Sequence, residues 1–228
     1  MHKFIVAVLV AWSFGSALAA DALTPTEMRW LRGAWPVLLY ARDSGLAVDI
    51  VVQPQPTPDA PPMALAFIDG RCKLVFSMRD NPDVATTAER IAPELFDAAL
   101  ELMAAHELGH CRRYLDGAWH GLPAGFVASV PEALAPALRA TFEQVEAARR
   151  EEGYADLVGL AWTRQHHPDL YPRLHAWLLA ERSNARVAGR HHDTLAWARL
   201  AGPGDTLARG SIFEAAAALW AEGLAADH

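Results

Sequence analysis

The chain has 228 residues, of which 52% are hydrophobic, and a formal net charge of −7 at pH 7. This length and apolar content predict a packed globular core without a long disordered tail. The acidic balance argues against a nucleic-acid partner, because such a partner would require a basic face.

The first 20 residues have the pattern of a secretory signal peptide. Lys3 provides a short basic start, an apolar run covers residues 4–14, and small residues at 17–19 offer a cleavage site. A transmembrane anchor is the alternative, but the run is shorter than the roughly 20 apolar residues that a span needs. We therefore expect a signal peptide over 1–20 and one exported domain over 21–228, periplasmic or secreted, with no membrane span after signal removal.

The chain contains two cysteines, Cys72 and Cys111. An oxidising compartment would allow them to form one disulfide. A pair of small buried thiols is the alternative, and the sequence leaves both possibilities open.

The predicted elements place a small sheet before a series of helices. Thr24 or Thr26 can cap a first helix over about 26–42. Strand-like runs follow at 48–53, 64–68 and 72–78, and Asp69-Gly70 predicts a hairpin between the last two. The pattern indicates an α+β fold with a small antiparallel sheet and a mainly helical body. Further helices are expected near 87–116, 132–166, 172–187, 193–201 and 211–225.

The most informative motif is His106-Glu107-Leu108-Gly109-His110, within the predicted helix 87–116. Residues four apart on a helix project from nearly the same side, so two imidazoles can hold one Zn²⁺ beside a glutamate. A buried His pair without a metal would have to satisfy its ring nitrogens inside the protein, which is costly. The pattern therefore favours a metal site. Both histidines continue a predicted buried stripe of Leu95, Ala99, Leu102 and Met103.

A zinc site needs a third protein ligand, and Glu152 and Asp156 lie one turn apart on the next long helix. One carboxylate can bind the metal while the other accepts the free N–H of a ligand histidine. From composition alone, however, a solvated helix surface is the more typical place for Glu152 in the charged run 146–152.

The segment 106–110, followed by Glu152-Gly153-Tyr154-Ala155-Asp156, resembles the gluzincins, which are zinc metallopeptidases with H-E-x-x-H and E-x-x-A-D motifs. The resemblance is strongest to the branch of the CAAX prenyl-proteases and their soluble periplasmic relatives, and it covers residues 106–156. It implies a zincin-like body in which His106, His110 and Glu152 bind zinc. By the same resemblance Glu107 is the general base, and Asp156 is the partner of a ligand histidine. Glu151 leaves the register ambiguous, but Glu152 places Ala-Asp at the family's spacing.

The resemblance also implies a donor for the oxyanion that develops during hydrolysis. His191, His192 and Arg199 are the candidates after the ligand helices. Their alternative reading is structural, with Asp193 as the N-cap of the helix 193–201 and the two histidines in its flanking loop.

Gluzincins also pair extended substrate with a strand beside the motif helix. By resemblance, Lys73 to Arg79 is a candidate for that edge. A bond between Cys72 and Cys111 would then tie this strand to the motif helix.

Together these features predict an exported zinc peptidase that acts on a peptide or protein, with Glu107 as the general base toward a metal-activated water. A non-catalytic zinc-binding scaffold or interaction protein is the alternative. The glutamate in the motif favours the enzyme, because structural zinc needs no base and usually has four protein ligands.

Overall fold

The computed structural model describes residues 22–184 and 190–226, which form seven α-helices and one three-stranded sheet. The α+β class predicted from the sequence is confirmed. The predicted signal peptide lies outside the described residues. The strands are β1 Val48–Pro54, β2 Met63–Ile68 and β3 Arg71–Arg79, and the helices are α1 Pro25–Asp43, α2 Pro82–Glu89, α3 Phe96–Leu115, α4 Pro136–His166, α5 Tyr171–Arg182, α6 Leu195–Ala201 and α7 Ile212–Ala226.

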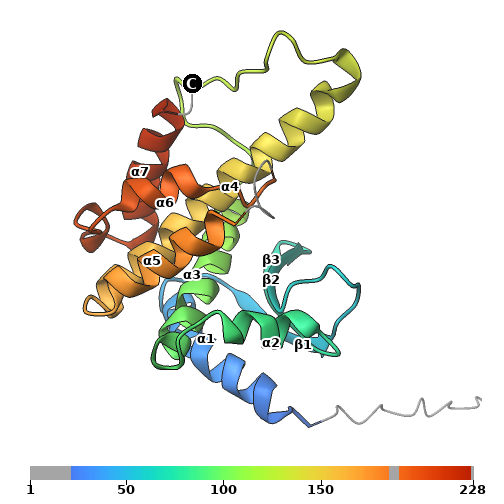
Figure 1. Cartoon of the computed structure of the whole chain (residues 1–228), viewed down its shortest axis with the longest axis vertical. Helices are drawn as coiled ribbons and strands as arrows, with labels where there is room; N and C mark the ends of the chain where they lie inside the picture. Colours follow the sequence, from blue (N-terminus) through green and yellow to red (C-terminus); the bar gives the residue numbers. More distant parts are fainter. Residues whose placement is uncertain (1–21, 185–189, 227–228) are drawn as a thin grey trace, which may run out of the picture.

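Helix α4 divides the molecule (Figure 1). Helices α5, α6 and α7 lie on one side of it, and the sheet lies on the other side with α1 and α2. Among the described helices, none combines the length and apolar character that crossing a bilayer would require.

The sheet is mixed, so the prediction of an antiparallel sheet is wrong for one of its two pairings. β3 is the central strand and pairs antiparallel with β2 but parallel with β1. The predicted hairpin is present, with φ of 53° at Asp69 and 73° at Gly70 between β2 and β3. Because both sides of β3 are paired, the prediction that Lys73 to Arg79 forms a substrate-binding edge is also wrong.

The helix predicted over 87–116 is two helices. α2 ends at Glu89, a short 3₁₀ turn follows at Pro93–Leu95, and α3 begins at Phe96. Pro93 lacks an N–H and disfavours helical backbone at the preceding residue, and Ala92 accordingly has φ −58° and ψ 134°. The break lets α2 and α3 run in different directions.

Two other predicted helix ends also shift. α4 begins at Pro136, four residues later than expected, because proline is well suited to the first turn of a helix. α6 has Thr194 as its N-cap residue, so the predicted capping role of Asp193 is wrong. The side chain of Thr194 does not cap the helix, because its hydroxyl group donates a hydrogen bond to Asp156 instead.

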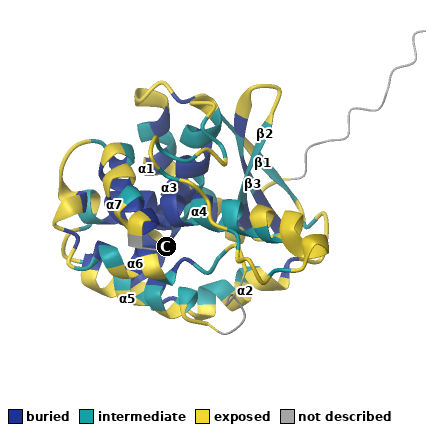
Figure 2. Cartoon of the chain, turned by 90° about the horizontal axis from the view of Figure 1, so that it is seen from above, coloured by how far each residue is buried: buried dark blue, intermediate teal, exposed yellow. Residues whose placement is uncertain are grey.

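Helices α3 and α4 form the most deeply buried part of the core (Figure 2). Glycines at their contact allow the two backbones to approach closely. A Cβ added at Gly109 would lie 3.1 Å from Ala155 Cα, and one added at Gly159 would lie 2.8 Å from the carbonyl oxygen of Leu102. This approach brings a carboxylate on α4 within reach of the two motif histidines on α3.

We expect Gly159→Ala to lower the free energy of unfolding by about 1–3 kcal/mol and to weaken zinc binding. The added methyl group would meet a backbone oxygen, which can move only if the two helices separate. Urea denaturation and zinc titration measure the two effects. Gly33→Ala is the control, because its methyl group would meet the side chain of Leu100 in the contact between α1 and α3. Equal zinc affinities in the two variants would contradict the role given to Gly159.

Candidate metal centre

Three side chains with metal-binding atoms converge between α3 and α4. His106 and His110 project from α3, and Glu152 projects from α4. The two His Nε2 atoms are 3.1 Å apart. Glu152 Oε2 lies 3.2 Å from His106 Nε2, and Glu152 Oε1 lies 3.5 Å from His110 Nε2. The three residues that the sequence predicts as ligands are therefore brought together.

This geometry fits a zinc ion. Zinc with tetrahedral coordination and bonds of about 2.0–2.1 Å holds its ligand atoms about 3.3 Å from one another, close to the separations of the three donors. Glu152 Oε2 is buried and receives no hydrogen bond from a described residue. Two imidazole nitrogens and one carboxylate oxygen are a donor set that zinc binds readily, and three protein ligands leave a fourth position open.

Asp156 fixes the orientation of one ligand histidine. Its Oδ1 atom lies 3.0 Å from His106 Nδ1, and its side chain is fully buried. An ionised carboxylate can only accept a hydrogen bond, so Nδ1 carries the proton and Nε2 directs a lone pair toward His110 and Glu152. Asp156 thus occupies the position that the sequence predicts for it.

Asp156 also binds Arg182 and Thr194, neither of which the sequence analysis identified. Arg182 at the end of α5 donates from Nε at 2.7 Å and from Nη2 at 2.6 Å, and the Thr194 hydroxyl donates to Oδ2. Burial alone would raise the pKa of Asp156, but Arg182 and the hydrogen bond with His106 hold it well below its usual range. The carboxylate therefore stays ionised and joins α5 and the residue before α6 to His106.

The surroundings of His106 favour a positive charge at this point. Burial by itself would lower the pKa of His106, but the hydrogen bond with Asp156 and the nearby negative charge of Glu152 raise it to about 10. Burial likewise tends to raise the pKa of Glu152, and the two histidines bring it well below its usual range. The cluster thus stabilises a cation between the imidazoles and the carboxylate, whether that cation is a proton or a metal ion.

Glu107 lies on the same helix, next to the first ligand histidine, and is partly buried. Burial raises its pKa, and the negative charge of Glu152 acts in the same direction. A raised pKa suits a carboxylate that must accept a proton near neutral pH. The backbone of Leu65 in β2 forms a hydrogen bond with Glu107, so the motif helix is joined to this outer strand of the sheet.

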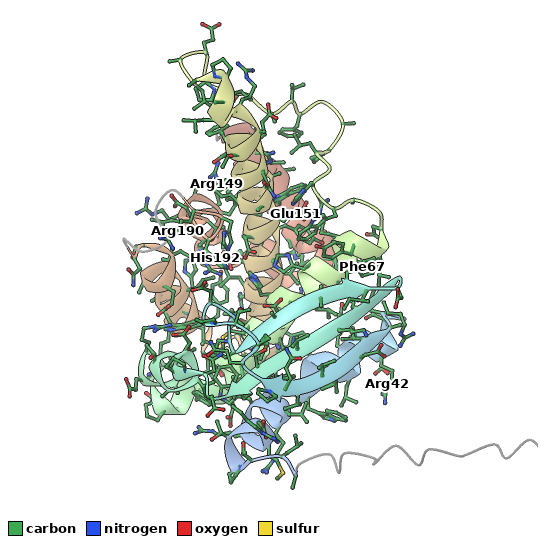
Figure 3. The ribbon with its side chains drawn as sticks, turned by 90° about the vertical axis from the view of Figure 1, so that its right-hand side faces the viewer. Arg42, Phe67, Arg149, Glu151, Arg190 and His192 are labelled. Carbon is green, nitrogen blue, oxygen red and sulfur yellow. A yellow bond between two sulfur atoms is a disulfide. The ribbon has the colours of Figure 1, made fainter. Side chains whose placement is uncertain are left out.

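Glu151, the residue before Glu152, has different partners, and these show which of the two glutamates faces the motif histidines. Its carboxylate accepts hydrogen bonds from Arg113 at 2.8 and 2.9 Å and from the backbone N–H of His120 at 2.7 Å. In Figure 3, Glu151 and His192 lie on either side of α4. Glu151 therefore supports the end of α3 and the loop after it, while Glu152 faces the two motif histidines.

The three predicted oxyanion donors are placed differently. His192 Nε2 lies 3.4 Å from Glu152 Oε2, and the ring of His191 lies beside that of His192 with a centroid separation of 4.1 Å. Arg199 is exposed on α6, and in the described part of the chain no hydrogen bond or ion pair joins its side chain to the three candidate ligands. Only the histidine loop is therefore brought to the centre.

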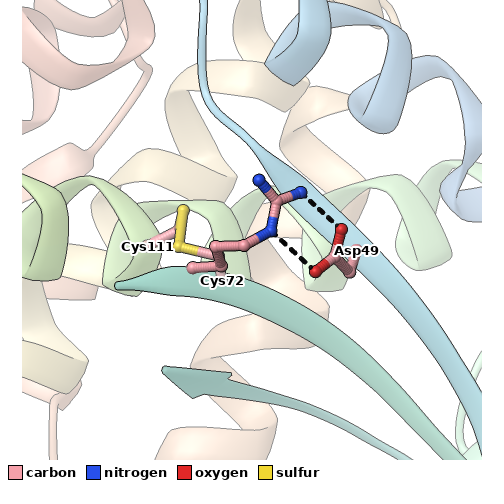
Figure 4. The surroundings of a disulfide bond; sticks show 4 residues. Asp49, Cys72 and Cys111 are labelled. Atoms are coloured by element: carbon pink, nitrogen blue, oxygen red, sulfur yellow. Dashed lines mark hydrogen bonds and ion pairs between the residues drawn. A yellow bond between two sulfur atoms is a disulfide. The ribbon is translucent and has the colours of Figure 1, made fainter. Parts of the chain in front are cut away.

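Cys72 and Cys111 form a disulfide (Figure 4), and their Cα atoms are 5.7 Å apart. Cys72 lies in β3, and Cys111 directly follows the ligand His110 in α3. Next to the bridge, Arg71 and Asp49 form an ion pair between β3 and β1. The bond attaches α3, the helix of the histidine motif, to the central strand, so the possibility of a disulfide that the sequence left open is realised.

Comparisons of the chain with family models, with curated proteins and with solved structures give no match. The resemblance to the gluzincins therefore stays a prediction that depends on the motif residues and on their geometry.

Proposed function

We propose that this chain is an exported zinc-dependent peptidase. The observation that carries the proposal is the convergence of His106, His110 and Glu152 on one point. Glu107, with a raised pKa, neighbours the first of these ligands. Asp156 holds the ligand histidine in the tautomer that zinc requires. A site that only held a structural zinc would need neither an adjacent base nor an open fourth position.

When bound, zinc would polarise the substrate carbonyl and lower the pKa of a water molecule in the site. Glu107 accepts a proton from that water as its oxygen bonds to the carbonyl carbon. The C–N bond then breaks, and Glu107 returns the proton to the leaving amine. One water molecule is consumed, and Glu107 ends in its starting state.

His192 is the proposed donor to the oxyanion. Its ring lies within 3.4 Å of Glu152, so it can face a carbonyl group bound at the centre. An N–H donor aimed at the developing negative charge would lower the barrier more than it would strengthen substrate binding. His191 and Arg199 have less support, since both are exposed.

β2 is the strand that suits an extended peptide. In the described chain it pairs only with β3, so its second side offers backbone groups, and the Leu65 backbone already contacts Glu107. A peptide added as a further strand would place its own backbone next to the base.

Two features support export. The first 20 residues have the composition of a secretory signal, and the structure contains a disulfide. Disulfides persist in oxidising compartments and are rare in the cytosol, which supports a periplasmic or secreted protein.

Glu107→Gln should retain zinc and lose peptide hydrolysis by on the order of 10²–10⁴-fold, because the amide cannot accept the proton. Glu143→Gln is the matched control, since Glu143 is exposed on α4 and should leave activity unchanged. Metal analysis should find about one zinc per chain in the wild type and both variants. Peptide hydrolysis is measured before and after chelation, and again after zinc is returned.

The other outcomes are equally informative. Zinc in all three proteins without hydrolysis of any peptide would support the non-catalytic scaffold. A wild type that binds no zinc would overturn the metal site itself. Equal activity of Glu107→Gln and Glu143→Gln would remove the base from its role.

A further inference from the structure

A cavity of about 190 Å³ opens directly beside the proposed base and the first ligand histidine. Both Glu107 and His106 form part of its wall. Pockets that hold a whole small molecule commonly have volumes of about 300–1,000 Å³, so this cavity is the size of a single side chain. Anything that fills it must lie next to the bond that is cleaved.

The interior of the cavity is mostly apolar, and several elements contribute to it. Its walls include Met63 from β2, Leu102 and Met103 from α3, and Trp177 and Leu178 from α5, with Pro62 at the start of the sheet. Apart from Glu107, the charged groups at the rim are already paired, since Arg90 Nε lies 2.9 Å from Glu181 Oε1 and Arg182 binds Asp156. A substrate carboxylate would therefore lose its hydration without gaining a free partner, and an ammonium group could pair only with the base that hydrolysis requires.

We propose that this cavity is a specificity pocket for one large apolar side chain, such as Leu, Met or Phe, adjacent to the scissile bond. The proposal rests on the proposed peptidase function, and it adds the substrate class. Peptides with Gly, Asp or Lys at that position are poor substrates.

The test uses blocked pentapeptides of the form acetyl-Ala-Ala-X-Ala-Ala-amide with X as Gly, Ala, Leu, Phe, Asp or Lys. For the zinc-loaded wild type we expect kcat/KM for Leu and Phe to exceed that for Ala by at least about 10-fold. Cleavage should occur at a bond of X. Calorimetry measures the binding of the same peptides to Glu107→Gln. It ranks their affinities without depending on hydrolysis.

One variant tests the walls. Thr87→Trp adds bulk at the rim on α2 and should abolish the preference for Leu and Phe while the Ala peptide is still cleaved. Thr86→Trp is the matched control, because Thr86 is exposed on the same helix and does not line the cavity.

The outcomes separate this proposal from the peptidase function. Cleavage without preference, or a preference that Thr87→Trp leaves intact, overturns the specificity pocket alone. Ordered binding of the apolar peptides to Glu107→Gln without hydrolysis by the wild type supports the pocket and overturns the peptidase. The absence of both cleavage and binding overturns both.

Discussion

Asp156→Asn should lower the free energy of unfolding of the metal-free protein by about 3–5 kcal/mol. Asp156 is fully buried, and its carboxylate is the partner of the mostly buried Arg182 guanidinium, the Thr194 hydroxyl and the His106 ring. An amide leaves the guanidinium without a counter-charge in a low-dielectric environment. Urea denaturation in the presence of a chelator measures this loss separately from any loss of zinc.

Asp116→Asn is the matched control. Asp116 pairs with Arg112 at 2.8 Å, but both side chains are more than 40% exposed, so the change should cost less than about 1 kcal/mol. A double-mutant cycle of Asp156→Asn with Arg182→Met should give a coupling energy of a few kcal/mol, with the intact ion pair stabilising the folded state. Additive effects in that cycle would mean that the ion pair does not stabilise the fold.

The ion pair also has a pH signature. The pKa of Asp156 is lower in the folded than in the unfolded protein, so its contribution is present above the unfolded pKa of about 3.9 and is lost as the pH falls below it. The acid limb of the stability profile of the metal-free protein should therefore flatten in Asp156→Asn.

Removing the disulfide with Cys72→Ala and Cys111→Ala should cost about 4 kcal/mol, because the bridge closes a loop with a sequence separation of 39 residues. Zinc affinity should fall as well, since Cys111 is next to His110 and the bond holds this part of α3 against β3. Thermal unfolding and zinc titration of the double variant measure the two effects.

The reduced wild type provides a comparison with the same packing volume at the cysteines. It should match the double variant in stability to within about 1 kcal/mol, because both lack the cross-link. If reduction leaves the zinc affinity unchanged, the bridge stabilises the fold without positioning the ligand helix.

The sequence was most informative where the determinants are local. The spacing of His106 and His110 places both rings on one helix face, and Asp69-Gly70 adopts the positive φ values that its turn requires. Glu152 was accessible only through its distance from the motif in a resembling family. In the structure, α3 and α4 pack closely at Gly109 and Gly159, and this contact brings Glu152 next to the two motif histidines.

The parts that the sequence missed depend on contacts between distant segments. The parallel pairing of β1 with β3 skips β2, which lies between them in the sequence, and no turn motif predicts such a pairing. Arg182 is at the end of a helix, where a basic residue is common for electrostatic reasons alone, so nothing marked it as the partner of a carboxylate 26 residues earlier. Pro93 was a local signal for the break between α2 and α3, and the longer helical pattern concealed it.

The position of Asp156 has a consequence for the dynamics of the molecule. One carboxylate orients a ligand histidine and holds both the last turn of α5 and the residue that precedes α6. Zinc that binds only the folded state adds its binding free energy to the stability of the elements that form the site. The backbone amides of α5 and α6 would then exchange their hydrogens more slowly when metal is bound, although neither helix supplies a ligand. Metal occupancy could thus be followed from a part of the chain remote in sequence from the histidine motif.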